Sequence, residues 1–173
     1  FTTTAIFTSE STSVGTLKRM DESMQRIFVD TSAFIALLDP RDDCHVQAVR
    51  IEQSLANQAA HLVTTNFVLD ETYTGLRGKI QHSAILRFRD SVRQSRRLSV
   101  IRISEALEDQ AWEIFARYED KDFSFTDCTS FAVMQQLGIT AGNGHVSRAG
   151  RRIPPAGARI HEVALPPINA TMR

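Results

Sequence analysis

A short apolar run near the start of the chain, residues 27–29, ends in the carboxylate of Asp30 and passes directly into a helix-like segment at 31–38. This pattern predicts that the carboxylate lies at the carboxyl end of a strand, which is where open α/β sheets bind their ligands. The pattern recurs at 64–71 and at 124–127, where an acid again lies at the start of an expected helix. Three acids at three strand-to-helix junctions favour a metal site over a solvated surface.

The acids at these junctions are Asp30, Glu71 and Asp127. Brought to one edge of a sheet, three carboxylates cannot all stay ionised without a cation, so the arrangement predicts a divalent metal. Oxygen ligands without histidine or thiolate favour Mg²⁺ or Mn²⁺ over zinc, and such a centre can activate water for phosphodiester hydrolysis. Asp70 competes with Glu71, because helical geometry turns adjacent residues about 100° apart and only one of them can face Asp30.

Expected strands alternate with expected helices from residue 26 to residue 140. This alternation predicts a three-layer α/β/α fold with a central parallel sheet of four to five strands. We expect strands at 26–30, 61–64 and 98–103, a fourth strand opening at 139–140, and helices that include 31–38, 80–97, 105–118 and 127–137. The expected helix caps are Asp42 or Asp43, Thr65, Ser104 and Thr126, and Gly138 is expected to end the last helix.

The composition is that of an ordinary soluble protein, with 42% hydrophobic and 23% charged residues among 173. One folded domain is expected, and no apolar segment approaches the length of a membrane span. We interpret residues 1–24 as a mobile leader, with Met20 or Met24 as candidate natural starts, and residues 25–140 as the folded domain. Residues 141–173 hold one acid, four prolines and five arginines, and we interpret them as an atypical carboxyl-terminal tail.

Charge is unevenly distributed although the formal net charge is zero. The segment 77–102 holds eight basic residues and one acid, whereas 105–127 holds eight acids and two basic residues. This polarity is typical of an acidic metal centre beside a basic strip that handles a polyanion. A pair of solvated helix faces would give the same pattern, so both interpretations stay open.

The two cysteines, Cys44 and Cys128, are far apart and share no ligand spacing with the five histidines. A zinc site is therefore not expected, and a reduced, cytoplasmic chain is the default. Trp112 and Phe115 are separated by a helical spacing and are predicted to lie in the core.

Three stretches, "IFVDTSAFIALLD", "LVTTNFVLDETYTGLR" and "DFSFTDCTSFAVMQQLGI", together resemble the PIN-domain ribonucleases, especially the VapC-type toxins of bacterial toxin–antitoxin pairs. The resemblance covers residues 26–140 and implies Mg²⁺- or Mn²⁺-dependent RNA cleavage by metal-activated water. It also implies a homodimer and a neutralising antitoxin. By this resemblance the catalytic and metal-binding residues are Asp30, Glu71 and Asp127, and the supporting polar residues are Thr31, Asn66, Ser124 and Thr126. The basic strip itself, whose apolar face at Ile85, Phe88 and Val92 must turn inward, makes Arg87, Arg93, Arg96 and Arg97 the arginines expected to contact RNA or the antitoxin.

One departure from the family pattern concerns a fourth acid, which PIN domains usually carry just after their fourth strand. Here the corresponding stretch has no acid, and Asn143 is the nearest candidate ligand. The alternative hypothesis is therefore a catalytically weak or inactive PIN module that binds RNA or a protein. A phosphotransfer domain is disfavoured, because a haloacid-dehalogenase site needs an Asp where Ser32 stands, and a receiver domain needs an acid at the end of the third strand.

Overall fold

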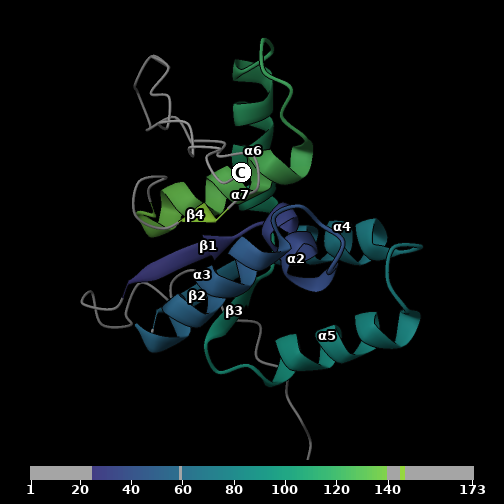
Figure 1. Ribbon diagram of the computed structural model, residues 1–173. Helices are drawn as coiled ribbons and strands as arrows, with labels where there is room; N and C mark the ends of the chain where they lie inside the picture. Colours follow the sequence, from purple (N-terminus) through teal and green to yellow (C-terminus); the bar gives the residue numbers. More distant parts are fainter. Residues whose placement is uncertain (1–24, 59, 140–144, 147–173) are drawn as a thin grey trace, which may run out of the picture.

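The computed structural model describes residues 25–58, 60–139 and 145–146 (Figure 1). Its sheet is parallel and has the strand order β3-β2-β1-β4, so the predicted parallel α/β fold is confirmed. Three strands of four or five residues carry the sheet, and the fourth adds only two residues beside β1. The strands are β1 (Arg26–Val29), β2 (His61–Thr65), β3 (Leu98–Ile101) and β4 (His145–Val146).

Helices cover the sheet, and Figure 1 shows α6 and α7 together on one side of it with α5 on the other. The last of them, α7, lies deepest, because eight of its 13 residues are buried. Phe28, Val63 and Met134 form part of the shared core between sheet and helices. The helices are α2 (Thr31–Leu38), α3 (His45–Asn57), α4 (Asn66–Leu76), α5 (His82–Gln94), α6 (Glu105–Arg117) and α7 (Phe125–Leu137).

Most helix boundaries follow local signals in the sequence. Thr65 caps α4 by accepting a hydrogen bond from Val68 N, and Ser104 caps α6 in the same way, as predicted. Gly138 ends α7 with φ of +68°, a left-handed conformation that favours glycine.

Five boundary predictions were wrong. The second helix, α3, has Cys44 at its N-cap, because the Asp42 carboxylate instead accepts from Cys44 N in the preceding turn. The basic helix α5 is shorter than 80–97, and β3 ends two residues before 103. The helix α7 begins two residues earlier than expected, with Ser124 rather than Thr126 as its cap. Strand β4 lies at 145–146, and Ile139 is buried but outside any strand.

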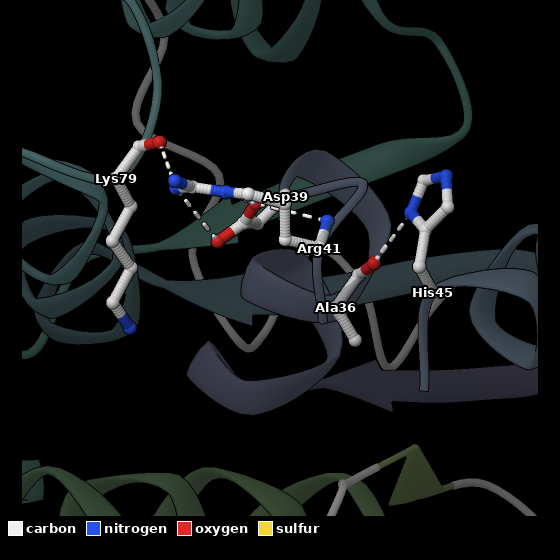
Figure 2. Close-up of polar contacts among 5 residues, drawn as sticks. All are labelled: Ala36, Asp39, Arg41, His45 and Lys79. Atoms are coloured by element: carbon white, nitrogen blue, oxygen red, sulfur yellow. Dashed lines mark hydrogen bonds and ion pairs between the residues drawn. The ribbon is translucent and has the colours of Figure 1, made fainter. Parts of the chain in front are cut away.

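The helices α2 and α4 pack closely and are joined at their carboxyl ends. A Cβ at Gly75 would lie 3.1 Å from Ile35 Cδ1, so glycine permits this approach. Figure 2 shows Arg41 beyond the end of α2, where its guanidinium donates to the Asp39 carboxylate and to the backbone carbonyl of Lys79 in the loop after α4. The Arg41 side chain thereby lowers the pKa of Asp39.

The prediction that Trp112 and Phe115 belong to the core was wrong. Their side chains on α6 are 53% and 44% exposed. The buried stripe of this helix consists instead of Leu107, Ala111 and Ile114, which repeat at the same helical spacing. Within the described residues, no helix is both long and apolar enough to cross a membrane.

Candidate active site at the carboxyl edge of the sheet

The carboxyl ends of β1, β2 and β3 lie at one edge of the sheet, where three helices begin. Cross-strand pairing aligns Phe28 with Val63 and Thr65 with Ile101, so the strands end at nearly the same level. The helices α2 and α4 start directly after β1 and β2, and α6 starts four residues after β3. Each of these amino-terminal helix ends presents backbone N–H groups and partial positive charge, which stabilise carboxylates and phosphates nearby.

Asp30 follows β1 and is the N-cap of α2. Its Oδ1 accepts hydrogen bonds from Ala33 N at 3.0 Å and from Ser32 Oγ at 2.9 Å. Its backbone is extended (φ −96°, ψ 177°), as a capping residue requires. Beneath it, the buried Thr64 hydroxyl donates to the carbonyl of Val29 at 2.9 Å. The partly buried Asp30 carboxylate is therefore held in a fixed orientation at the sheet edge.

Glu71 projects from α4 toward the first turn of α2. The Thr31 hydroxyl donates to Glu71 Oε2 over 2.5 Å, and its Oγ1 lies 3.5 Å from the Val68 carbonyl. This contact places the Glu71 carboxylate beside the residue that follows Asp30. Asp70 and Glu71 are both exposed on α4, and the hydrogen bond from Thr31 makes Glu71 the acid that contacts α2.

Asp127 lies in the first turn of α7, where it forms a capping box with Ser124. Its Oδ2 accepts from Ser124 N and Ser124 Oγ, both at 2.9 Å, and Asp127 N donates to Ser124 Oγ at 3.1 Å. The first turns of α4 and α7 are adjacent, because the Phe67 and Phe125 rings have centroids 6.3 Å apart. The third acid thus starts a helix beside the one that carries Glu71.

The predicted supporting residues take different roles. Asn66 Oδ1 accepts from Ile103 N at 2.8 Å and so joins the end of β2 to the exit of β3. Thr31 orients Glu71, and Ser124 orients Asp127. Thr126 contributes its backbone carbonyl, which accepts from the Thr129 and Ser130 hydroxyls, both at 2.8 Å. Sequence reasoning missed Ser32, whose hydroxyl bonds Asp30, although a serine two residues after a capping aspartate is a local signal for such a contact.

The chemical type of these donor atoms fits a divalent metal, because carboxylates and hydroxyls are the hard oxygen ligands that such cations prefer. Cys128 next to Asp127 adds no thiolate, since burial raises the pKa of its thiol to about 11. Within the residues that the structure describes, no three His, Cys, Asp or Glu side chains gather closely enough to hold a metal ion. Convergence of Asp30, Glu71 and Asp127 on one metal therefore stays a prediction.

Of the four arginines expected to contact RNA, Arg96 and Arg97 lie at the opposite edge of the sheet. Arg87 and Arg93 are exposed on α5, and Arg96 and Arg97 immediately precede β3. Residues before a parallel strand lie at its amino end, so Arg96 and Arg97 are about 13 Å or more from the edge that carries the acids, the length of a four-residue strand.

Arg97 is also engaged locally: its Nη1 lies 3.8 Å from Glu52 Oε1 on α3. Its Nε and Nη2 are buried and have no hydrogen-bond partner among the described residues. Asn143, the candidate fourth ligand, lies outside the described residues.

Comparison with known proteins identifies the family. The PIN domain family matches residues 27–146. The 23S rRNA-specific endonuclease VapC20 of Mycobacterium tuberculosis is 39% identical over 127 residues, which cover 72% of this chain and 94% of that protein. A VapC ribonuclease of Archaeoglobus fulgidus is 32% identical over 111 residues, or 63% of this chain and 70% of that protein.

The fold comparison agrees with the sequence comparison. The crystal structure of Mycobacterium tuberculosis VapC20, described as a sarcin–ricin loop cleaving toxin, superposes with a TM-score of 0.60 at 38% identity, covering 66% of this chain and 85% of that one. The chain belongs to the PIN-domain family. PIN-domain nucleases generally use divalent metals.

Proposed function

We propose that this protein is a metal-dependent endoribonuclease that hydrolyses RNA phosphodiester bonds and acts as the toxin of a toxin–antitoxin pair. The observation that carries the proposal is the Asp30–Thr31–Glu71 arrangement at the carboxyl edge of the sheet. Two carboxylates from different helices are positioned there by hydrogen bonds from fixed donors. Relatives named as ribonucleases, similar over most of their length, support the same activity.

Each proposed catalytic residue has a structural reason for its orientation. Asp30 is held by two donors of the first turn of α2, Glu71 by the Thr31 hydroxyl, and Asp127 by Ser124. These three carboxylates would hold the metal, proposed to be Mg²⁺ or Mn²⁺, which supplies an activated water and stabilises the leaving oxygen. The amino-terminal ends of α2, α4 and α6 would favour the scissile phosphate at the same edge.

The partners of this activity are part of the proposal. The named target of VapC20 makes a ribosomal RNA hairpin the first substrate to test. A neutralising antitoxin, a homodimeric state and a cytoplasmic location complete the proposed function. Residues 25–146, which extend the domain predicted at 25–140 to include β4, are proposed as its nuclease domain.

A second candidate function is an RNA- or protein-binding PIN module with weak or no catalysis. It is favoured by one observation: between Asp127 and Glu162 the sequence contains no acid, so the family's usual fourth carboxylate is absent. A weaker second metal position would lower turnover without abolishing RNA binding.

Cleavage of an RNA oligonucleotide that carries the sarcin–ricin loop separates the two functions. We expect the full chain to cleave it with Mg²⁺ or Mn²⁺ and not with EDTA, and the Asp30→Asn variant to bind but not cleave. Cleavage in EDTA, or equal cleavage by the variant, would exclude the proposed mechanism. Tight RNA binding with no cleavage under any metal condition would favour the binding module.

A further inference from the structure

An exposed tryptophan on α6 packs against the turn that carries the third acid of the site. Trp112 is 53% exposed, yet its ring centroid lies only 4.3 Å from that of Phe125, with the two ring planes 36° apart. Phe125 is two residues before Asp127 in the first turn of α7, and it packs against the core. Trp112 is therefore supported by a ring whose own position is fixed.

A series of aromatic rings joins Trp112 to the carboxyl edge of the sheet. Phe125 also contacts Phe67, with ring centroids 6.3 Å apart, and Phe115, at 6.2 Å. Phe67 lies in the first turn of α4, the helix that carries Glu71. The series Phe67, Phe125 and Trp112 thus extends from the helix starts beside the acids to the surface of the protein. An RNA whose phosphate lies at the acids has the base of a flanking nucleotide close to these rings.

The charges around the rings distinguish a base from an RNA backbone. Glu108 lies four residues before Trp112 on the same helix face, and Glu119 lies four residues after Phe115. Both glutamates are exposed. Carboxylates repel phosphates, but they accept hydrogen bonds from the amino groups of adenine, guanine and cytosine. The surface around Trp112 therefore disfavours the backbone of RNA and favours an unpaired base that carries an amino group.

We propose that Trp112 is a base-stacking platform of the active site, on which an unpaired, amino-bearing base beside the scissile phosphate stacks. The proposal deepens the proposed function and rests on it, because the ligand is the RNA substrate. Proteins commonly recognise single-stranded RNA by stacking splayed bases on aromatic side chains. The choice of cleavage position then depends on which nucleotide the RNA leaves unpaired, and not on the acids alone.

Binding of an RNA oligonucleotide that carries the sarcin–ricin loop tests the platform, with the full-length Asp30→Asn variant used so that the RNA stays intact. Trp112 is the only tryptophan, so stacking should quench its emission as the RNA binds. Fluorescence anisotropy of labelled RNA measures the affinity. Adding Trp112→Ala should weaken binding by about tenfold or more, and Trp112→Phe should restore most of the affinity.

Two controls separate stacking from other effects on binding. The salt dependence of the affinity should be the same with and without Trp112→Ala, because stacking makes no phosphate contact. Val46→Ser removes an exposed hydrophobic side chain from α3 and should leave the affinity unchanged.

An abasic nucleotide identifies the stacked base in protein that keeps Trp112. Each loop nucleotide is replaced in turn, and one replacement should weaken binding as much as Trp112→Ala weakens binding of the intact RNA. The two changes together should cause no further loss, because both remove the same contact. Uridine at that position should weaken binding less than the abasic nucleotide, because uridine keeps a base ring but lacks the amino group.

Three results would overturn the proposal. They are an unchanged affinity in Trp112→Ala, losses that add at every loop position, or a blue shift of Trp112 emission with protein concentration alone. The last would mean that a second copy covers the rings. Failure of the proposed function gives a different result: the RNA then quenches Trp112, but wild-type protein cleaves it with no metal.

Discussion

The two edges of the sheet use polar side chains in different ways. At the carboxyl edge, Asp30 and Asp127 accept hydrogen bonds from backbone N–H groups at helix starts. At the amino edge, the buried His61 pairs with Ser99 Oγ at 2.8 Å, and Arg97 lies near Glu52. The carboxyl edge therefore holds its carboxylates with backbone N–H groups and side-chain hydroxyls, whereas the amino edge pairs one side chain with another.

This difference teaches that the acids of the carboxyl edge have two separable roles. Asp30 stabilises the fold as the cap of α2 and Asp127 through the capping box of α7, and we expect both carboxylates to supply charge for the chemistry. Asparagine can cap a helix as well as aspartate but carries no charge. We expect His61 and Ser99 at the amino edge to have only the stabilising role, so substitutions there should change stability and leave catalysis intact.

The largest expected effect separates the two roles of Asp30. Asp30→Asn should lower the cleavage rate by about 10²–10⁴-fold while keeping the melting temperature within a few degrees, because asparagine retains the cap. Asp30→Ala should lose the same activity and also about 1 kcal/mol of folding free energy. Single-turnover cleavage and urea unfolding measure the two quantities. A destabilised Asp30→Asn would show that the cap needs the charge.

A smaller effect is expected at Thr31, which positions Glu71. Thr31→Val removes the hydroxyl at nearly constant shape and should lower kcat and Mn²⁺ affinity by about 10-fold to 100-fold. Thr31→Ser keeps the hydroxyl and should restore both. Loss of activity in the serine variant as well would assign Thr31 a packing role.

At the amino edge, we expect a group whose titration changes the folding stability and leaves the cleavage rate unchanged. Burial, together with the charge of Arg26, lowers the pKa of His61 below 6.5, so the folded state prefers the neutral ring. This contribution to stability is complete above pH 6.5 and is lost as the pH falls through the folded-state value. Urea midpoints measured from about pH 8 to about pH 5 should fall in wild type and flatten in His61→Asn. The exposed His82→Asn is the matched control and should follow wild type.

The smallest effect tests which residue caps α7. Ser124→Ala should cost about 1 kcal/mol, because it removes the hydroxyl that bonds Asp127. Thr126→Ala keeps the backbone carbonyl that the structure uses and should cost less. Urea unfolding of both variants decides between the two caps. A larger loss of unfolding free energy in Thr126→Ala than in Ser124→Ala would show that Thr126 is the cap, as the sequence predicted.

Sequence predicts the parts of this fold that local chemistry determines. The strand–Asp30–helix junction and the caps Thr65, Ser104 and Gly138 lie where their residue types predict. The start of α7 could also have been found, because Ser124 and Asp127 have the spacing of a capping box. The three segments that carry the acids lie where helices were predicted, and Glu71, which the motif favoured over Asp70, contacts Thr31 at the start of α2.

Sequence does not predict features that depend on which surface of an element is covered by another element. The helix α6 has two apolar stripes, and only packing decides that Leu107, Ala111 and Ile114 are buried while Trp112 is exposed. The short strand β4 exists only through its pairing with β1. The basic residues on α5 indicate the sign of the charge on this surface, but they do not indicate which edge of the sheet the surface lies near. Arg97 could have been placed at the amino edge from the sequence, because it directly precedes the strand β3.

The connection of α2 and α4 at both ends has a consequence for motion. Thr31 in the first turn of α2 donates to Glu71 and lies beside the Val68 carbonyl in the first turn of α4, Gly75 permits the close approach of Ile35, and Arg41 joins the end of α2 to the loop after α4. Two helices held at both ends should open together as one cooperative unit. Their amide protons should then exchange with solvent at a common rate. Replacing Arg41 should release the carboxyl ends first, leaving the two acid-bearing turns protected.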